Sequence, residues 1–411
     1  MRMTISAAAL PDGPDAVDLH DPRLFADGEP HAAWRYLRRH APVHRHQTRD
    51  GLAYWSVTRY PDVATVLRDH RTFTSSRGNL LTTLGADDVA TGRMVVVADP
   101  PRHGRLRQTQ VSALASDVRD ATGAALRGAV RERIRPGLDG EVVDLAVVAA
   151  QLPMLVLGPA MRLPEQDWAR LSELARAAVA PDDPVHTAGT TWATLAAAHH
   201  ELFSYFRSAL LDRRARPQED LLSHLLTGSD GEPREQLEVA LYHCYSLLIG
   251  AVTTLPHVVT ATAMEVIEDK RILEVMGADP GTLSTGVEEA LRWSSPAAHV
   301  LRHTTRPVDL AGARLPAGEA VVAWLGSANR DETVFEAGDR FDPRRSPNRH
   351  LAFGFGPHYC LGAMVARRAL LTVFTELVSS TVSMRSAGPV EHTSSHFIAG
   401  INRLPLRLIP R

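Results

Sequence analysis

The chain has 411 residues, with 45 Lys or Arg against 47 Asp or Glu, and 44% of its residues are hydrophobic. The net charge of −2 argues against a nucleic-acid-binding protein, because such proteins usually carry a basic excess. Two cysteines, Cys244 and Cys360, are too few for a disulfide framework. The N-terminus has no apolar segment long enough for a signal peptide, so we expect a cytoplasmic protein.

Hydrophobic periodicity is typical of a mainly α protein with small β-sheets (α+β). In chain order, the predicted elements are a strand at 53–58, helices at 61–70 and 193–216, a strand, turn and strand within 308–324, a helix at 363–378 and a strand at 404–409. No repeat or low-complexity linker interrupts the chain. We therefore predict one domain over residues 1–411, with about 1–29 as an N-terminal extension.

Two donor side chains open a predicted helix in the segment DPPRHGRLR, residues 99–107. Pro100 and Pro101 favour a helix start. His103 and Arg107 are four residues apart and therefore lie on one side of its first turns. Two donors there suit a carboxylate, although each could also be an ordinary surface residue.

An uncharged stretch covers residues 239–264, which contain no Asp, Glu, Lys or Arg. Its length would suffice to span a bilayer. Polar residues such as His243, Thr253 and His257 make it too polar for a good transmembrane helix. We expect a long helix through a globular core instead, in which Cys244 is a core residue and Pro256 kinks the helix.

A possible ion pair lies in the segment GVEEALRW, residues 286–293. Glu289 and Arg292 are three residues apart and share a helix face. Such a pair is usually solvated and contributes little to stability. The segment 330–349, rich in Asp, Arg and Pro, is expected to be irregular.

Cys360 follows a turn built from Gly354, Phe355, Gly356 and Pro357. This run predicts a tight turn whose backbone can approach another group closely. Cys360 directly precedes a strong helical pattern, and a helix N-terminus favours the thiolate. A structural zinc site would need further ligands nearby. A single thiolate suits a metal whose other ligands come from a macrocycle.

Two other interpretations of Cys360 follow from the residues alone. It could be a buried apolar thiol in a core turn. It could also be the nucleophile of a hydrolase with His358 as its base, but two residues apart on a tight turn is poor geometry for that pair.

The segment 350–368 resembles the haem-binding loop of the cytochrome P-450 family, Phe-x-x-Gly-x-x-x-Cys-x-Gly. Phe353, Gly356, Cys360 and Gly362 fill this pattern without a gap, and the resemblance covers the chain from about residue 30 to its end. It implies the cytochrome P-450 fold, with haem b between a long central helix and the cysteine loop. Cys360 would be the axial ligand of the haem iron.

The same resemblance assigns roles to other residues. Glu289 and Arg292 would form a buried pair with Arg345, which lies in the segment FDPRR, and hold the irregular segment before the cysteine loop. The haem propionates would contact four residues: His103, Arg107, Arg302 and His358.

The resemblance breaks in the long uncharged helix. The family pattern there is Ala/Gly-Gly-x-Asp/Glu-Thr, and with Gly250 and Thr253 matched, Val252 occupies the acidic position. Thr253 would then be the catalytic residue, holding water and donating a hydrogen bond on the distal side, while valine relays no proton. Protons could arrive through ordered water, a substrate hydroxyl or His257, although His257 is read first as a core or pocket residue without such a role.

The implied activity is that of a haem-thiolate monooxygenase acting on an apolar small molecule, a polyketide, terpene or peptide intermediate of secondary metabolism. O2 and electrons from ferredoxin and ferredoxin reductase would be consumed, with Arg102, Arg105, Arg367 and Arg368 as a basic docking face. The implied pocket residues are Met94, Val95, Val96, Val97, Leu247, Leu248, Ala251, Val252, Ala297, Ala298, His299, Val300, Ile398 and Ala399.

Val252 also keeps other functions open. The protein could use peroxide, which already carries the protons, or catalyse ring closure or coupling. It could also be a haem protein that catalyses no oxygenation. We expect neither a nucleic-acid nor a membrane partner.

Overall fold

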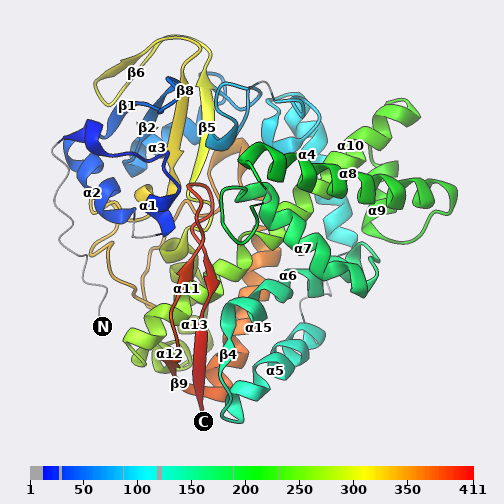
Figure 1. The fold of residues 1–411 in the computed structure, drawn as a ribbon, viewed down its shortest axis with the longest axis vertical. Coiled ribbons are helices and arrows are strands. Elements are labelled where there is room, and N and C mark those ends of the chain that lie inside the picture. Colours follow the sequence, from blue (N-terminus) through cyan, green and yellow to red (C-terminus); the bar gives the residue numbers. More distant parts are fainter. Residues whose placement is uncertain (1–12, 27–29, 87, 118–122, 188, 230) are drawn as a thin grey trace.

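A computed structural model describes residues 13–26, 30–86, 88–117, 123–187, 189–229 and 231–411 (Figure 1). The helices are α1 Arg23–Ala26, α2 His31–His40, α3 Tyr60–Arg68, α4 Arg102–Asp117, α5 Ala124–Leu138, α6 Leu145–Ala160, α7 Glu165–Val179, α8 Thr191–Ala215, α9 Leu221–Thr227, α10 Pro233–Val252, α11 Leu255–Glu268, α12 Arg271–Met276, α13 Pro280–Ser294, α14 Leu325–Ala328 and α15 Ala363–Ser380. The strands are β1 Val43–Gln47, β2 Ala53–Val57, β3 Phe73–Thr74, β4 Val143–Asp144, β5 His299–Thr304, β6 Val308–Leu310, β7 Ala313–Leu315, β8 Ala320–Trp324, β9 Thr381–Ser386, β10 Glu391–His392, β11 Ile401–Arg403 and β12 Pro405–Pro410.

The largest sheet has the strand order β1-β2-β8-β5-β3. Strands β2 and β8 run parallel, with Trp55 opposite Val321, and the other neighbours are antiparallel. The sheet and helices α1 to α3 lie together on one side of the molecule, and most of the longer helices lie on the other (Figure 1). Helix α11 lies near the middle of this view, and α10 lies on the helical side (Figure 1).

The main hydrophobic core lies on the helical side. It takes buried residues from α5 to α11, from α13 and α15, and from the strands near the C-terminus. Helices α10 and α11 form its centre, packed against α6, α8 and α13. Together they are long and apolar enough to cross a membrane, but 61% of their most apolar window is buried inside the fold. The uncharged stretch is therefore a core segment here.

The central helix is interrupted between α10 and α11. Thr254 has φ −123° and ψ −52°, outside helical geometry, and α11 begins at Leu255. Pro256 occupies the first turn of α11, where its missing N–H removes no helical hydrogen bond. The predicted kink at Pro256 is thus a full break two residues earlier.

The predicted elements are found close to their expected limits. The helical patterns at 61–70, 193–216 and 363–378 correspond to α3, α8 and α15, and the strand patterns at 53–58 and 404–409 to β2 and β12. Residues 308–324 contain three strands instead of two. Strands β6 and β7 pair with each other, whereas β8 joins the large sheet.

Candidate functional site

The cysteine loop is held against the end of α3. Gly356 opens the short 3-10 turn η4, Gly356–His358, with φ +73°. A Cβ on Gly356 would lie 2.8 Å from the backbone oxygen of Leu67. Cys360 N–H donates to the Phe353 oxygen at 2.8 Å, which closes the loop just before α15. Only glycine fits at position 356 without moving the loop.

Cys360 is a free cysteine and an exposed residue. Burial raises the pKa of the thiol, and the N–H groups of Gly362 and Ala363 and the charges of Arg107 and Arg367 act in the opposite direction. The open side of the sulfur can accept a metal, and the surrounding N–H donors and cations suit a thiolate once a metal is bound.

Three of the four predicted propionate contacts lie close together: His103 and Arg302 are buried, and His358 is half-buried. His103 from α4 and His358 from η4 have ring centroids 4.4 Å apart. Arg302 from β5 is 4% exposed, and its Nη1 donates to the Leu301 oxygen at 2.7 Å. Arg107 lies one turn after His103 on α4 and is half-buried. His103 Nε2 is buried without a partner among the described residues.

These basic groups disturb one another. Burial, with the charges of Arg302, His103 and Arg107, lowers the pKa of His358 to about 2. Burial lowers the pKa of Arg302 to about 10, although Asp99 opposes that shift. Such a cluster is unfavourable until an anion joins it, so the residues fit a group with carboxylates.

Asp99 already bonds protein groups. Its Oδ1 accepts from the N–H and Oγ of Ser75 at 3.1 and 2.8 Å, and its Oδ2 accepts from Thr74. Ser75 Oγ also lies 3.2 Å from His358 Nε2. Sequence reasoning missed Ser75 and Asp99. The position of Asp99 just before the helix that carries His103 was a usable signal, whereas nothing in the sequence marks Ser75.

Glu289 and Arg292 form a fully buried pair on α13, in which the Nε and Nη2 of Arg292 each donate at 2.7 Å. Arg345 Nε reaches Glu289 Oε2 at 3.1 Å. Arg292 Nη1 donates to the oxygens of Asn329 and Gly338 at 2.7 and 2.8 Å. The structure thus brings the three predicted residues together in the interior instead of at a solvated surface.

The same carboxylate fixes the irregular segment before the cysteine loop. Glu289 Oε1 accepts from the N–H of Asp342 at 2.8 Å, and Oε2 accepts from Asn348 Nδ2 at 3.1 Å. Asn329 Oδ1 accepts from the N–H of Leu351 at 2.6 Å, directly before the loop. Since these donors are satisfied locally, this segment keeps its shape without regular secondary structure.

The break in the central helix presents one face to open space. Gly250 is exposed although α10 lies centrally, and a Cβ there would meet nothing within 4 Å. Thr254 lies next to it, with its Oγ1 donating to the Gly250 oxygen at 2.8 Å, and is half-buried. Thr253 is 2% exposed and donates to the Ile249 oxygen at 2.8 Å. Val252 is fully buried on the side opposite Gly250.

Several predicted pocket residues belong to separate packing clusters. Leu248 and Val252 lie in the main core, Val95 packs with Leu106 and Val239, and Ala298 is in the cluster of the large sheet. Leu247, Ala251, Ala297 and Met94 are partly exposed. Ile398 is buried and pairs with Ala297 through an isolated β-bridge.

His299 of β5 is packed in the interior by contacts on both of its ring nitrogens. It is fully buried, its Nε2 accepts from the N–H of Leu81 at 3.1 Å, and its Nδ1 lies 3.0 Å from the His396 oxygen. Its ring packs on Trp324 with centroids 5.0 Å apart. Both ring nitrogens are engaged and the ring packs against the sheet core, and the pocket role of His299 stays a prediction.

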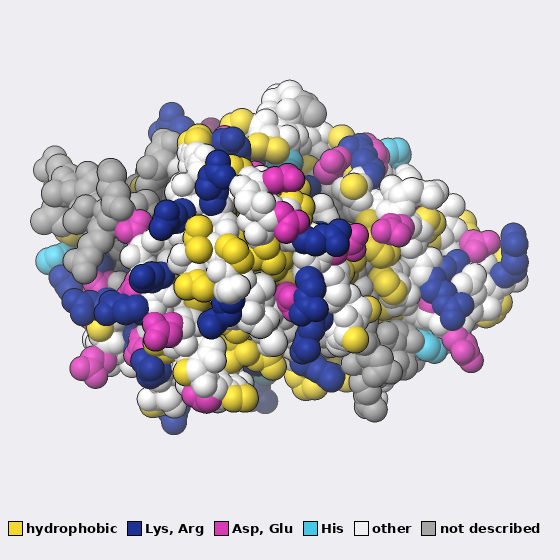
Figure 2. All heavy atoms as spheres, turned by 90° about the horizontal axis from the view of Figure 1, so that it is seen from below, with side chains coloured by type: hydrophobic (Ala, Val, Ile, Leu, Met, Phe, Trp, Pro, Cys, Tyr) yellow, Lys and Arg dark blue, Asp and Glu magenta, His cyan; other side chains and the backbone are white. Residues whose placement is uncertain are grey.

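The predicted docking arginines differ in availability. Arg367 is held by Glu288, with Nε and Nη2 contacts of 2.7 and 2.8 Å, and its guanidinium lies over the Phe353 ring. Arg102 Nε donates to the Gly92 oxygen at 3.0 Å, whereas Arg105 is exposed. Arg367 therefore braces the cysteine loop. On the face seen in Figure 2, basic and acidic side chains are interspersed with apolar ones.

Comparison with known proteins identifies the family to which this arrangement belongs. The family model for cytochrome P-450 matches residues 264–381. The cytochrome P-450 NovI of Streptomyces niveus is 32% identical over 411 residues, which cover 99% of each chain. The cyclomarin C epoxidase CymV of Salinispora arenicola is 33% identical, over 90% of this chain and 93% of that protein.

A solved structure shows the same fold. The crystal structure of the P-450 enzyme OxyD, involved in the biosynthesis of vancomycin-type antibiotics, superposes with a TM-score of 0.84 at 32% identity. The match covers 96% of this chain and all of that chain. With relatives of this identity along nearly its whole length, the chain belongs to the cytochrome P-450 family and is a P-450 monooxygenase.

Proposed function

We propose that this monooxygenase binds haem b through Cys360 and oxidises an apolar small molecule of secondary metabolism, with O2 and electrons from ferredoxin and its reductase. One observation carries the cofactor assignment. Within the described part of the chain, Asp99 is the acid that offsets the buried charge of Arg302, and Asp99 already accepts from Ser75 and Thr74, while the buried His103 Nε2 has no partner.

The residues present fit haem. His103, Arg107, Arg302 and His358 would hold its two propionates, and the exposed sulfur of Cys360 would ligate the iron. The Glu289–Arg292–Arg345 network would position the segment behind the cysteine. When bound, thiolate-ligated haem supplies O2 activation and oxygen transfer.

On the distal side, we assign the reactive face to Gly250 and Thr254. Open space lies in front of Gly250, and the Thr254 hydroxyl stands beside it. Shifted by one residue, the family pattern keeps Gly250 and Thr254 but places Ala251 at its glycine position and Thr253 at the acidic position. Thr254 would then hold the distal water, in place of Thr253. In either register the acidic position is uncharged.

Three partly exposed apolar residues support an apolar substrate: Leu247, Ala251 and Ala297. Relatives support the secondary-metabolite class, since NovI and OxyD are similar along the whole chain and OxyD is involved in antibiotic biosynthesis. Arg105 is an exposed cation for an acidic ferredoxin. We place the protein in the cytoplasm.

The uncharged acidic position favours one second candidate, a peroxide-driven oxidation. Peroxide brings its own protons, so the missing acid would then cost nothing. Turnover with NADPH and a surrogate ferredoxin system, compared with turnover on peroxide alone, separates the two candidates.

The decisive measurement for the cofactor is the absorption spectrum of the reduced protein with carbon monoxide. Thiolate ligation by Cys360 predicts a strongly red-shifted Soret band, which Cys360→Ser should abolish. Cys244→Ala is the matched control, because Cys244 is buried in the core and should leave the band in place. A band typical of histidine ligation, or purified protein without haem, would overturn the assignment.

A further inference from the structure

A cavity lies behind the central helix, on the side of Val252. It has a volume of about 780 Å³ and is bounded by α6, α7, α8 and α11. Exposed residues such as Val147 and Val185 line its outer part, so it is open to solvent. Its inner end reaches Val252, Pro256 and His257, at the break between α10 and α11.

A much smaller cavity continues from this inner end. Its volume is about 10 Å³, which is near the lower limit for one water molecule. Four polar residues line both cavities: Arg176, His186, His257 and Asn402. The small cavity alone is also lined by Thr253 and by Ile398, which belongs to the predicted substrate pocket. It therefore joins the outer cavity to the break in the central helix.

His257 is fixed as a hydrogen-bond donor toward this junction. The ring is 7% exposed, and its Nδ1 accepts from the N–H of Ile401 at 3.2 Å. A neutral imidazole that accepts at Nδ1 carries its proton on Nε2. His257 Nε2 has no partner among the described residues, and neither does the guanidinium of Arg176, which faces the same space. Both donors face the cavities, where water oxygen can accept from them.

The His257 ring fills a space beside Gly400. A Cβ on Gly400 would lie 2.6 Å from His257 Cε1 and 2.6 Å from Thr393 Oγ1. Glycine at position 400 thus leaves the room that the imidazole fills. Burial, and then the charge of Arg176, lowers the pKa of His257 to about 4, so the ring stays neutral at physiological pH. It can orient water but does not itself take up protons there.

We propose that the cavity behind the central helix is the water route to the break between α10 and α11, and that His257 is a positioning residue for the water that bridges it to Thr253, the neighbour of Thr254 at that break. This proposal rests on the monooxygenase function. The reaction of substrate RH with O2, two electrons from ferredoxin and two protons gives ROH and one water. The route would deliver those two protons through hydrogen-bonded water and let the product water leave, which replaces the missing acid.

The test blocks the cavity without touching the haem site. Ala197 on α8 lines the outer cavity, whereas the adjacent exposed Ala196 does not. In ¹⁵N-histidine-labelled protein, reduced and bound to carbon monoxide, His257 should show the Nε2–H tautomer, in exchange with water. Ala197→Trp should slow that exchange at least about tenfold, and Ala196→Trp should leave it unchanged. An Nδ1–H tautomer, or exchange insensitive to Ala197→Trp, would overturn the proposal.

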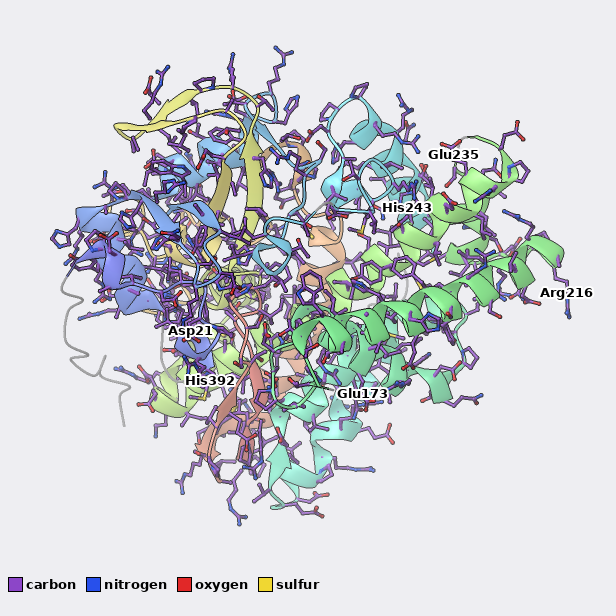
Figure 3. All side chains as sticks on the ribbon, turned by 45° about the horizontal axis from the view of Figure 1, so that its top comes forward. Asp21, Glu173, Arg216, Glu235, His243 and His392 are labelled. Atoms are coloured by element: carbon purple, nitrogen blue, oxygen red, sulfur yellow. The ribbon has the colours of Figure 1, made fainter. Side chains whose placement is uncertain are left out.

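The second measurement is coupling, the amount of product formed per NADPH consumed. His257→Asn keeps an acceptor for the Ile401 N–H but removes the Nε2–H, so product per NADPH should fall several-fold while peroxide release rises. His243→Asn is the control, because His243 is a buried histidine on α10 that lines neither cavity and lies well away from Glu173, a residue of the outer cavity (Figure 3). Unchanged coupling in His257→Asn would count against the route. A red-shifted carbon monoxide band in every variant would show that the haem-thiolate assignment itself still stands.

Discussion

At the scale of single residues, two adjacent threonines separate by environment. Thr253 is 2% exposed, whereas Thr254 is half-buried beside the open space at Gly250. We expect Thr254→Ala to lower product per NADPH about tenfold or more, because loss of a proton-handling group typically costs 10²–10⁴-fold in rate. Thr253→Ala should have the smaller effect. The measurement is the amount of product and of released peroxide in each variant. A larger loss in Thr253→Ala than in Thr254→Ala would return the distal role to Thr253.

Residue identity was easier to predict than residue orientation. The pairing of Glu289 and Arg292 was predicted from their i, i+3 spacing, whereas its burial with Arg345 was predicted from the resemblance to the cytochrome P-450 family. The alignment of the family pattern at Thr253 was less secure, because the helix breaks there. Helical periodicity then no longer shows on which face of the helix a residue lies. The direction in which His299 faces was hard to predict for a related reason. A strand of buried residues gives no alternation that could show which face meets a pocket.

At the scale of elements, the cysteine loop depends on its contact with the end of α3. Gly356→Ala should cost about 1–2 kcal/mol for the left-handed backbone, and more for the contact with the Leu67 oxygen. Gly312→Ala is the matched control, because Gly312 has φ +86° but nothing within 4 Å of its Cβ position. We expect lower haem content and a lower melting temperature in Gly356→Ala than in Gly312→Ala. Equal losses in both variants would show that the loop is not held in this way.

The elements themselves followed from the sequence more fully than their junctions did. Amphipathic spacing located α3, α8 and α15 to within a few residues. The segment 330–349 has no periodicity, so its shape could be expected only as irregular. Its geometry depends on the buried Glu289 carboxylate, which lies some fifty residues earlier in the chain, and local patterns do not report such long-range contacts. The cavity behind α11 likewise arises from the packing of four helices.

At the scale of the whole molecule, the fold buries many neutral histidines. Burial is the main cause that lowers the pKa to about 4 in five of them, His46, His243, His257, His299 and His303. They belong to both sides of the molecule, the large sheet as well as the helical core. Acid sensitivity should therefore be a property of the entire fold, and a single site should not account for it.

The direction of this effect follows from proton binding. Between pH 4 and 6.5 the unfolded chain binds these protons and the folded chain does not, so the free energy of unfolding falls as pH decreases through this window. For His243, whose ring nitrogens have no partner among the described residues, the loss at pH 5 is about 2 kcal/mol. His243→Phe should therefore recover about that amount at pH 5 relative to its effect at pH 7.5, in urea unfolding followed by circular dichroism. Cys244→Ala, on the same helix, should change stability equally at both pH values, because burial raises the pKa of its thiol far above this range. A His243→Phe effect that does not vary with pH would mean that the ring is already protonated in the folded protein or that water reaches it.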